Sequence, residues 1–126
     1  MKRYIKPKDY VLEALGIERE DILSIHYEIQ LNKLFRNEGC RSRKTPDIIY
    51  RVEDSLRCQY YLVGEIKSRE NKHSLPRALE QSIAYSWELH NHGIPHMSFY
   101  AFSNKKPILK RLYEMEEIYE NERRNI

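Results

Sequence analysis

Two runs rich in isoleucine, valine and tyrosine constrain the fold of this 126-residue chain most strongly. They are DIIYRV at 47–52 and CQYYLVGEIKS at 58–68, and the polar stretch EDSLR at 53–57 lies between them. β-branched and aromatic runs on either side of a short polar turn are typical of a β-hairpin. We therefore expect two neighbouring antiparallel strands near the middle of the chain.

A helix is predicted before this hairpin, over about 19–36. Ile22, Ile25, Ile29 and Lys33 repeat at helical spacing, and further leucines widen the apolar side. A polar loop then leads into the hairpin.

The rest of the chain continues the alternation of helix and strand. Helices are predicted at about 7–15, 75–91 and 106–123, and a buried strand at 96–103. The helix at 75–91 has Ser74 as its predicted N-cap, Pro76 in its first turn and Gly93 after its end. This order predicts an α/β sandwich in which helices flank a small mixed sheet.

Length and composition favour one domain over residues 1–126, with a core at about 19–103. No apolar run approaches the roughly 20 residues that span a bilayer, and the N-terminus lacks the apolar stretch of a signal peptide. Cys40 and Cys58 are too few for a four-cysteine metal site, so we expect free thiols in a reducing, cytoplasmic compartment. The net charge of +3 is mild, so a polyanionic partner would have to meet local basic patches.

The second strand of the hairpin carries two charged residues on one face. Glu65 and Lys67 are two positions apart, so they project from the same side of the strand. If the hairpin pairs symmetrically about Leu56, Asp47 lies opposite Glu65, with Cβ atoms roughly 4.5–5.5 Å apart. Two carboxylates so placed repel each other, and a divalent cation would remove that repulsion. The alternative is an ordinary ion pair between Glu65 and Lys67.

Two motifs resemble the signature of the PD-(D/E)xK nucleases, the restriction-endonuclease-like fold. These are Pro46-Asp47 and, after the turn, Gly64-Glu65-Ile66-Lys67. In the following helix, Gln81-x-x-x-Tyr85 is similar to a motif of the RecB-like branch. Upstream, Ile25-His26-x-x-Ile29 resembles the first motif of that branch, in which a helix histidine meets the metal. The resemblance covers about residues 20–103.

The resemblance implies an α/β/α sandwich that hydrolyses phosphodiester bonds in DNA with Mg²⁺ or Mn²⁺. Asp47, Glu65 and the carbonyl of Ile66 would hold the metal. Lys67 would orient the attacking water, and Gln81 and Tyr85 would position the DNA strand or the lysine.

The remaining metal ligand is left open between His26 and Glu28. His26 lies on the apolar stripe of the predicted helix and is equally compatible with an ordinary core histidine. Glu28 lies beside that stripe and is equally compatible with a solvated surface charge.

Basic residues stand on both sides of the predicted site, where they would contact DNA phosphates or simply be solvated. They are Arg41, Arg43 and Lys44 before Asp47, and Arg69, Lys72 and Arg77 after Glu65. A homodimer is compatible with this size, since cutting both strands takes two sites. Two alternative functions remain: a structure-selective DNA resolvase of the same fold, and a non-catalytic DNA-binding or protein-interaction module.

Overall fold

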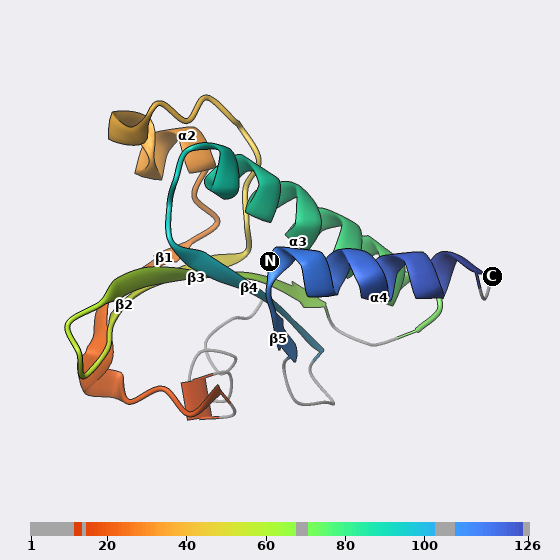
Figure 1. Cartoon of the computed structure of the whole chain (residues 1–126), viewed down its shortest axis with the longest axis horizontal. Helices are drawn as coiled ribbons and strands as arrows, with labels where there is room; N and C mark the ends of the chain where they lie inside the picture. Colours follow the sequence, from red (N-terminus) through yellow and green to blue (C-terminus); the bar gives the residue numbers. More distant parts are fainter. Residues whose placement is uncertain (1–11, 14, 68–70, 103–107, 125–126) are drawn as a thin grey trace.

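The computed structural model describes residues 12–13, 15–67, 71–102 and 108–124. Most of the helix predicted at 7–15, and Arg69, lie outside these residues. The described chain forms a mixed α/β structure built on an open five-stranded sheet (Figure 1).

The sheet has the strand order β1-β2-β3-β4-β5, which follows the sequence. Its strands are β1 (Ile22–Tyr27), β2 (Ile48–Glu53), β3 (Gln59–Lys67), β4 (His96–Phe102) and β5 (Ile108–Lys110). β2 is antiparallel to both β1 and β3, β3 and β4 are parallel, and β5 is antiparallel to β4. The sheet is therefore mixed, as the sequence predicted.

The helices are α2 (Leu31–Leu34), α3 (Ser74–Asn91) and α4 (Leu112–Arg124), with short 3-10 turns η1 (Arg19–Asp21) and η2 (Arg36–Glu38). Because two parallel strands need a crossover connection, α3 joins β3 to β4. These three helices lie on one side of the sheet (Figure 1). On the other side, Leu12, Leu15 and Ile17 of the described chain pack against the sheet.

The predicted hairpin is confirmed, together with its register. Ile48 pairs with Gly64, and the pairing continues to Glu53 and Gln59. The carboxylate of Asp54 holds the turn by accepting the backbone N–H groups of Leu56 and Cys58, each at 2.9 Å.

The prediction of a helix over residues 19–36 is wrong. Residues Ile22–Tyr27 form the edge strand β1, which pairs with β2, and only Leu31–Leu34 of the predicted span is α-helical. The physical reason is a β-bulge between Ile22 and Ser24. Because a bulge adds a residue to one strand, Ile22 and Ile25 face the same core cluster although they are three apart. The bulge therefore gives these strand residues the three-residue spacing of apolar side chains that is typical of a helix.

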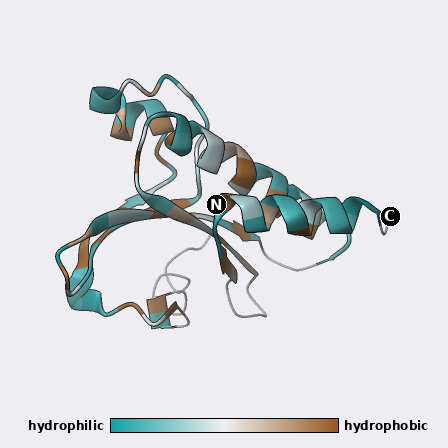
Figure 2. Ribbon diagram, viewed as in Figure 1, coloured by the Kyte–Doolittle hydropathy of each residue, from teal (hydrophilic) through white to brown (hydrophobic). Residues whose placement is uncertain are grey.

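The last predicted helix begins later than expected. Residues Ile108–Lys110 form β5 on the edge of the sheet, and α4 starts only at Leu112. A three-residue strand is too short to show an alternating pattern. Most of α4 is hydrophilic, and it packs on α3 through the buried Met115 (Figure 2).

The long helix α3 is confirmed with a different cap. His73 occupies the N-cap position, and the side chain of Asn71 accepts the backbone N–H groups of His73 and Ser74 at 2.8 and 2.9 Å. At the other end Gly93 adopts a left-handed conformation, as a glycine after a helix commonly does.

The core occupies both faces of the sheet. On the helical side, Ile49 and Val63 pack with Phe35 of the chain after α2 and with Leu89 of α3. The opposite face is lined by side chains that are fully or almost fully buried: Ile48, Tyr50, Val52, Leu62, Phe99 and Ala101.

Gly64 is required by close packing across the sheet. A Cβ atom at this position would lie 2.0 Å from the Cζ atom of Phe99, which is the neighbour of Gly64 on β4. Such an approach between a strand and a ring is possible only where the strand has no side chain. Gly64 immediately precedes Glu65, so this packing also fixes the backbone of the candidate site.

Candidate functional site

Two buried carboxylates lie side by side where β2 begins. The hairpin register, continued by one residue, places Asp47 opposite Glu65, and the two side chains interact directly. Asp47 is 4% exposed and Glu65 is 2% exposed. Oδ2 of Asp47 accepts the backbone N–H of Ile66 at 2.7 Å, and its own N–H donates to the carbonyl of Gly64 at 3.1 Å. Asp47 is thus fixed to β3 at two points.

Two further side chains contact Glu65, and a third contacts one of these two. The hydroxyl of Tyr85 donates to Oε1 of Glu65 at 2.5 Å, and Nζ of Lys67 lies 3.3 Å from Oε2. Lys67 also donates to Oε1 of Gln81 at 2.7 Å. Gln81 and Tyr85 are one turn apart on α3, so a single helix face supplies both contacts. The structure therefore brings together five of the residues that the sequence singled out.

The surroundings of Glu65 favour its protonated form. Burial, and then the negative charge of Asp47, raise the pKa of Glu65 from 4.5 to about 7, although Tyr85 and Lys67 act in the opposite direction. Burial and the charge of Glu65 likewise raise the pKa of Tyr85. Near neutral pH, Glu65 is therefore easier to protonate than an ordinary glutamate.

The two neighbours of the Glu65 carboxyl group favour different protonation states. The hydroxyl of Tyr85 donates to Oε1 of Glu65 and so favours the ionised form, whereas the side-chain hydrogen bond with Asp47 favours the protonated form, in which a carboxyl group donates to the adjacent carboxylate. The Tyr85 hydroxyl also lies 3.4 Å from the carbonyl oxygen of Thr45.

The carboxylate pair fits a hard divalent cation. Mg²⁺ and Mn²⁺ prefer oxygen ligands, and a cation between the two carboxylates would offset the repulsion that raises the pKa of Glu65. A third side-chain ligand is not in place among the residues that the structure describes. No histidine, cysteine, aspartate or glutamate in the described chain joins Asp47 and Glu65 in a group whose ligand atoms all lie within 4.8 Å of one another.

His26 and Glu28 lie nearby without joining the pair. His26 is on β1, opposite Ile49, and not on a helix as predicted; its Nε2 atom lies 3.1 Å from Oγ of Ser24. Glu28 is exposed, has a φ of 48°, and donates its backbone N–H to the carbonyl of Asp47 at 3.1 Å. Both residues line a surface hollow together with Lys33 and Thr45.

The predicted phosphate contacts are exposed wherever the structure describes them. Arg41, Arg43 and Lys44 belong to the loop that leads into Asp47, and this loop is held to α2 because Leu31 donates its N–H to the carbonyl of Lys44. Lys72 and Arg77 flank the start of α3. Basic side chains therefore precede Asp47 and follow Glu65 along the chain.

A second cluster of side chains that can bind a metal ion was not predicted from the sequence. Cys40, Glu88 and His92 form it between the loop that precedes β2 and the end of α3. The spacing Glu88-x-x-x-His92 was a usable signal, because residues four apart share a helix face. The contact with Cys40, which is 48 residues before Glu88, required the tertiary fold.

Comparisons with protein-family models, with curated proteins and with solved structures gave no significant match. In the part of the chain that the structure describes, no helix is long and apolar enough to cross a membrane.

Proposed function

We propose that the chain is a metal-dependent DNA nuclease of the PD-(D/E)xK type, of the RecB-like branch. The observation that carries the proposal is the buried pair of Asp47 and Glu65, with Lys67 on the same strand face and Gln81 and Tyr85 reaching it from α3.

An ordinary ion pair explains this arrangement less well. A structural pair of Glu65 and Lys67 gains nothing from a second buried carboxylate, which adds a repulsive charge. Burying like charges together is costly for the fold. Such a cost is typical of sites in which a ligand or metal ion supplies the missing charge.

The fold part of the proposal rests on the middle of the chain. Asp47 precedes β2, Glu65 and Lys67 lie near the end of β3, and α3 follows with Gln81 and Tyr85. This succession supports a restriction-endonuclease-like arrangement. Residues 19–36 do not contribute to it, because they hold β1 where the resemblance implied a helix.

The contacts of Asp47, Glu65 and Lys67 support a role for each of them. Asp47 and Glu65, with the carbonyl of Ile66, would hold Mg²⁺ or Mn²⁺. His26 and Glu28, which do not join the pair in this structure, are the two candidates for a further ligand. A bound cation supplies a Lewis acid and lowers the pKa of a coordinated water. Lys67 orients the attacking water and stabilises negative charge that develops on the phosphate.

Two residues of α3 position this machinery. Gln81 accepts a hydrogen bond from Nζ of Lys67 and so holds the ammonium group beside Glu65. Tyr85 holds one carboxylate oxygen of Glu65. Both are positioning residues for the reaction.

DNA is the proposed substrate because exposed arginine and lysine side chains precede Asp47 and follow Glu65 in the sequence. Arg41, Arg43, Lys44, Lys72 and Arg77 would contact phosphates on either side of the scissile bond. The mild net charge of +3 makes these local contacts the main source of affinity.

Incubation with linear, circular and single-stranded DNA, with Mg²⁺, Mn²⁺ or a chelator, tests the proposal. We expect cleavage that depends on the metal and falls by about 100-fold or more in Asp47→Asn and Glu65→Gln. Glu117→Gln, an exposed change on α4, is the matched control and should cleave like the wild type. Cleavage that survives in Glu65→Gln, or no cleavage by the folded wild type on any substrate, would contradict the proposal.

A further inference from the structure

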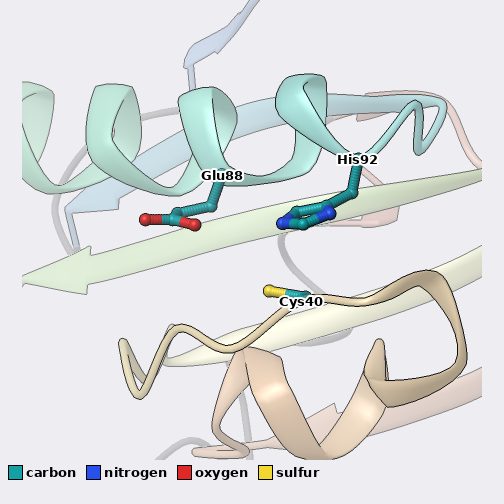
Figure 3. Close-up of side chains that lie close together, drawn as sticks. All are labelled: Cys40, Glu88 and His92. Carbon is teal, nitrogen blue, oxygen red and sulfur yellow. The ribbon is translucent and has the colours of Figure 1, made fainter.

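A second set of metal-ligand side chains lies at the C-terminal end of α3. The thiol of Cys40, the carboxylate of Glu88 and the imidazole of His92 each place one ligand atom within 4.8 Å of the other two. Figure 3 shows Glu88 and His92 extending from α3 toward Cys40 on the facing loop.

The backbone positions Cys40 under the helix. Gly39, with a φ of 87°, ends η2, and Cys40 donates its N–H to the carbonyl of Phe35 at 3.2 Å. Phe35 is fully buried and anchors this turn. A Cβ atom at Gly39 would lie 3.8 Å from Nδ1 of His92, so the loop passes directly beside the imidazole.

The three groups are not engaged elsewhere. Within the described residues, no hydrogen bond or ion pair involves the thiol of Cys40, the carboxylate of Glu88 or the ring of His92. Cys40 is 4% exposed, while Glu88 and His92 are half-buried. Polar groups that gather in a partly buried place normally bond to one another or to a third partner.

The chemistry of this donor set selects the metal. A thiolate is a soft ligand that Mg²⁺ and Mn²⁺ avoid, whereas Zn²⁺ accepts sulfur, imidazole nitrogen and carboxylate oxygen. Bonds of about 2.0–2.3 Å in a tetrahedral site place ligand atoms roughly 3.3–3.8 Å apart. Side-chain rotations that move these atoms by about 1 Å would therefore close the site.

We propose that Cys40, Glu88 and His92 bind Zn²⁺, with water as the fourth ligand. The ion would tie the loop between η2 and β2 to the C-terminal end of α3. That loop runs on to Asp47, and α3 carries Tyr85, so zinc would also stabilise the arrangement of the two elements that meet at Glu65. The zinc site shares no side chain with the carboxylate pair, so the two proposals stand or fall separately.

Zinc titration of the metal-free full-length chain in competition with a chromophoric chelator, at neutral pH, tests this proposal. We expect Glu65→Gln, which removes a ligand of the carboxylate pair, to bind one Zn²⁺ per chain with the affinity of the tightest zinc site of the wild type. The affinity should fall by more than about 100-fold in Cys40→Ser and in His92→Gln, because each removes a direct ligand. The matched controls are Cys58→Ser, which changes the exposed cysteine, and His90→Gln on the same helix; both should bind like the wild type.

Cobalt provides an independent readout of the sulfur ligand. Co²⁺ should give a thiolate charge-transfer band with the wild type and with Cys58→Ser, and the band should be absent from Cys40→Ser. Circular dichroism shows whether each variant is folded, and the half-buried His92→Gln remains informative if the buried Cys40→Ser unfolds. The proposal is overturned if the wild type binds no zinc, or if folded His92→Gln binds it with unchanged affinity.

Discussion

The carboxyl group of Glu65 has neighbours that act on its charge in opposite directions. Burial and Asp47 raise its pKa to about 7, while the hydroxyl of Tyr85 and the ammonium of Lys67 lower it. The effect of each neighbour can therefore be measured through the titration of a single side chain. Three predictions at the residue scale concern this group and its neighbours.

Removing the charge of Asp47 should lower the pKa of Glu65. In Asp47→Asn the electrostatic repulsion disappears, so Glu65 should ionise at lower pH than in the wild type. In Tyr85→Phe the stabilising hydrogen bond is absent, and the pKa should rise above that of the wild type. Carbon-13 NMR of the glutamate carboxyl groups measures both shifts. A wild-type Glu65 that titrates near 4.5 would show that the pair is not coupled as described.

The same shift makes the stability of the metal-free protein depend on pH. The pKa of Glu65 is about 7 in the folded state and near 4.5 when the chain is unfolded, so the contribution of this group is complete below about pH 4.5. It is lost as the pH rises through about 7, by an amount on the order of 3 kcal/mol. Urea unfolding of the wild type and of Glu65→Gln at several pH values measures the difference. Parallel pH profiles of the two proteins would contradict this.

Lys67 should act on turnover rather than on affinity. Lys67→Met is expected to lower kcat by about 100-fold, with a much smaller effect on metal binding, because the proposed role of the ammonium is to stabilise the transition state. Lys67→Arg should not restore the rate, since a planar guanidinium cannot replace a compact ammonium at the same place. Gln81→Ala should cost less than Lys67→Met, because it loosens the lysine without removing it. Equal losses in DNA affinity and in kcat for Lys67→Met would indicate a simple phosphate contact.

At the scale of elements, the middle of the chain was the part that its sequence predicted best. The hairpin β2–β3 and the helix α3 combine strong local patterns with clear ends, such as Gly93. β1 was missed because its bulge places Ile22 and Ile25 three apart on one face. β5 was missed because three residues are too few to show the alternation of apolar and polar side chains that is typical of a strand.

The residues of the candidate site were likewise predictable only where a local sequence pattern positions them. Asp47, Glu65 and Lys67 were predictable because a hairpin register is local, and Gln81 and Tyr85 because they are one helical turn apart. The placement of His26 depended on the wrong helix over 19–36. The group of Cys40, Glu88 and His92 depended on a loop that packs against a distant helix, which no local pattern records.

The close approach of β3 and β4 yields a prediction for the sheet. Gly64→Ala should destabilise the protein by at least about 2 kcal/mol, because the added methyl group would overlap the ring of Phe99. Phe99→Leu in the same chain should recover part of this loss by making room. A double-mutant cycle from urea unfolding measures the coupling between the two positions. If the changes in unfolding free energy of the two single variants add up in the double variant, the ring of Phe99 does not determine which side chains fit at position 64.

At the scale of the whole molecule, affinity for DNA should come from a few cations near the site. Replacing Arg43 and Lys44 with alanine should weaken binding and reduce the slope of log K against log salt by about 1 for each phosphate that the double variant no longer neutralises. The matched control replaces the exposed Arg123 and Arg124 at the end of α4. Fluorescence anisotropy at several salt concentrations, with Ca²⁺ in place of the active metal, provides the measurement. Equal effects of the two double variants would mean that the binding is not localised at the site.

The central claim is that Asp47 and Glu65 together hold a hard divalent cation. Calorimetric titration of the metal-free protein with Mn²⁺ above pH 7 tests it most directly, because Glu65 is then mostly ionised. We predict one Mn²⁺ per chain, with binding abolished in Asp47→Asn and Glu65→Gln and retained in Glu117→Gln and Cys40→Ser. Binding of Mn²⁺ that is unchanged in folded Glu65→Gln, or abolished in Cys40→Ser alone, would contradict the claim.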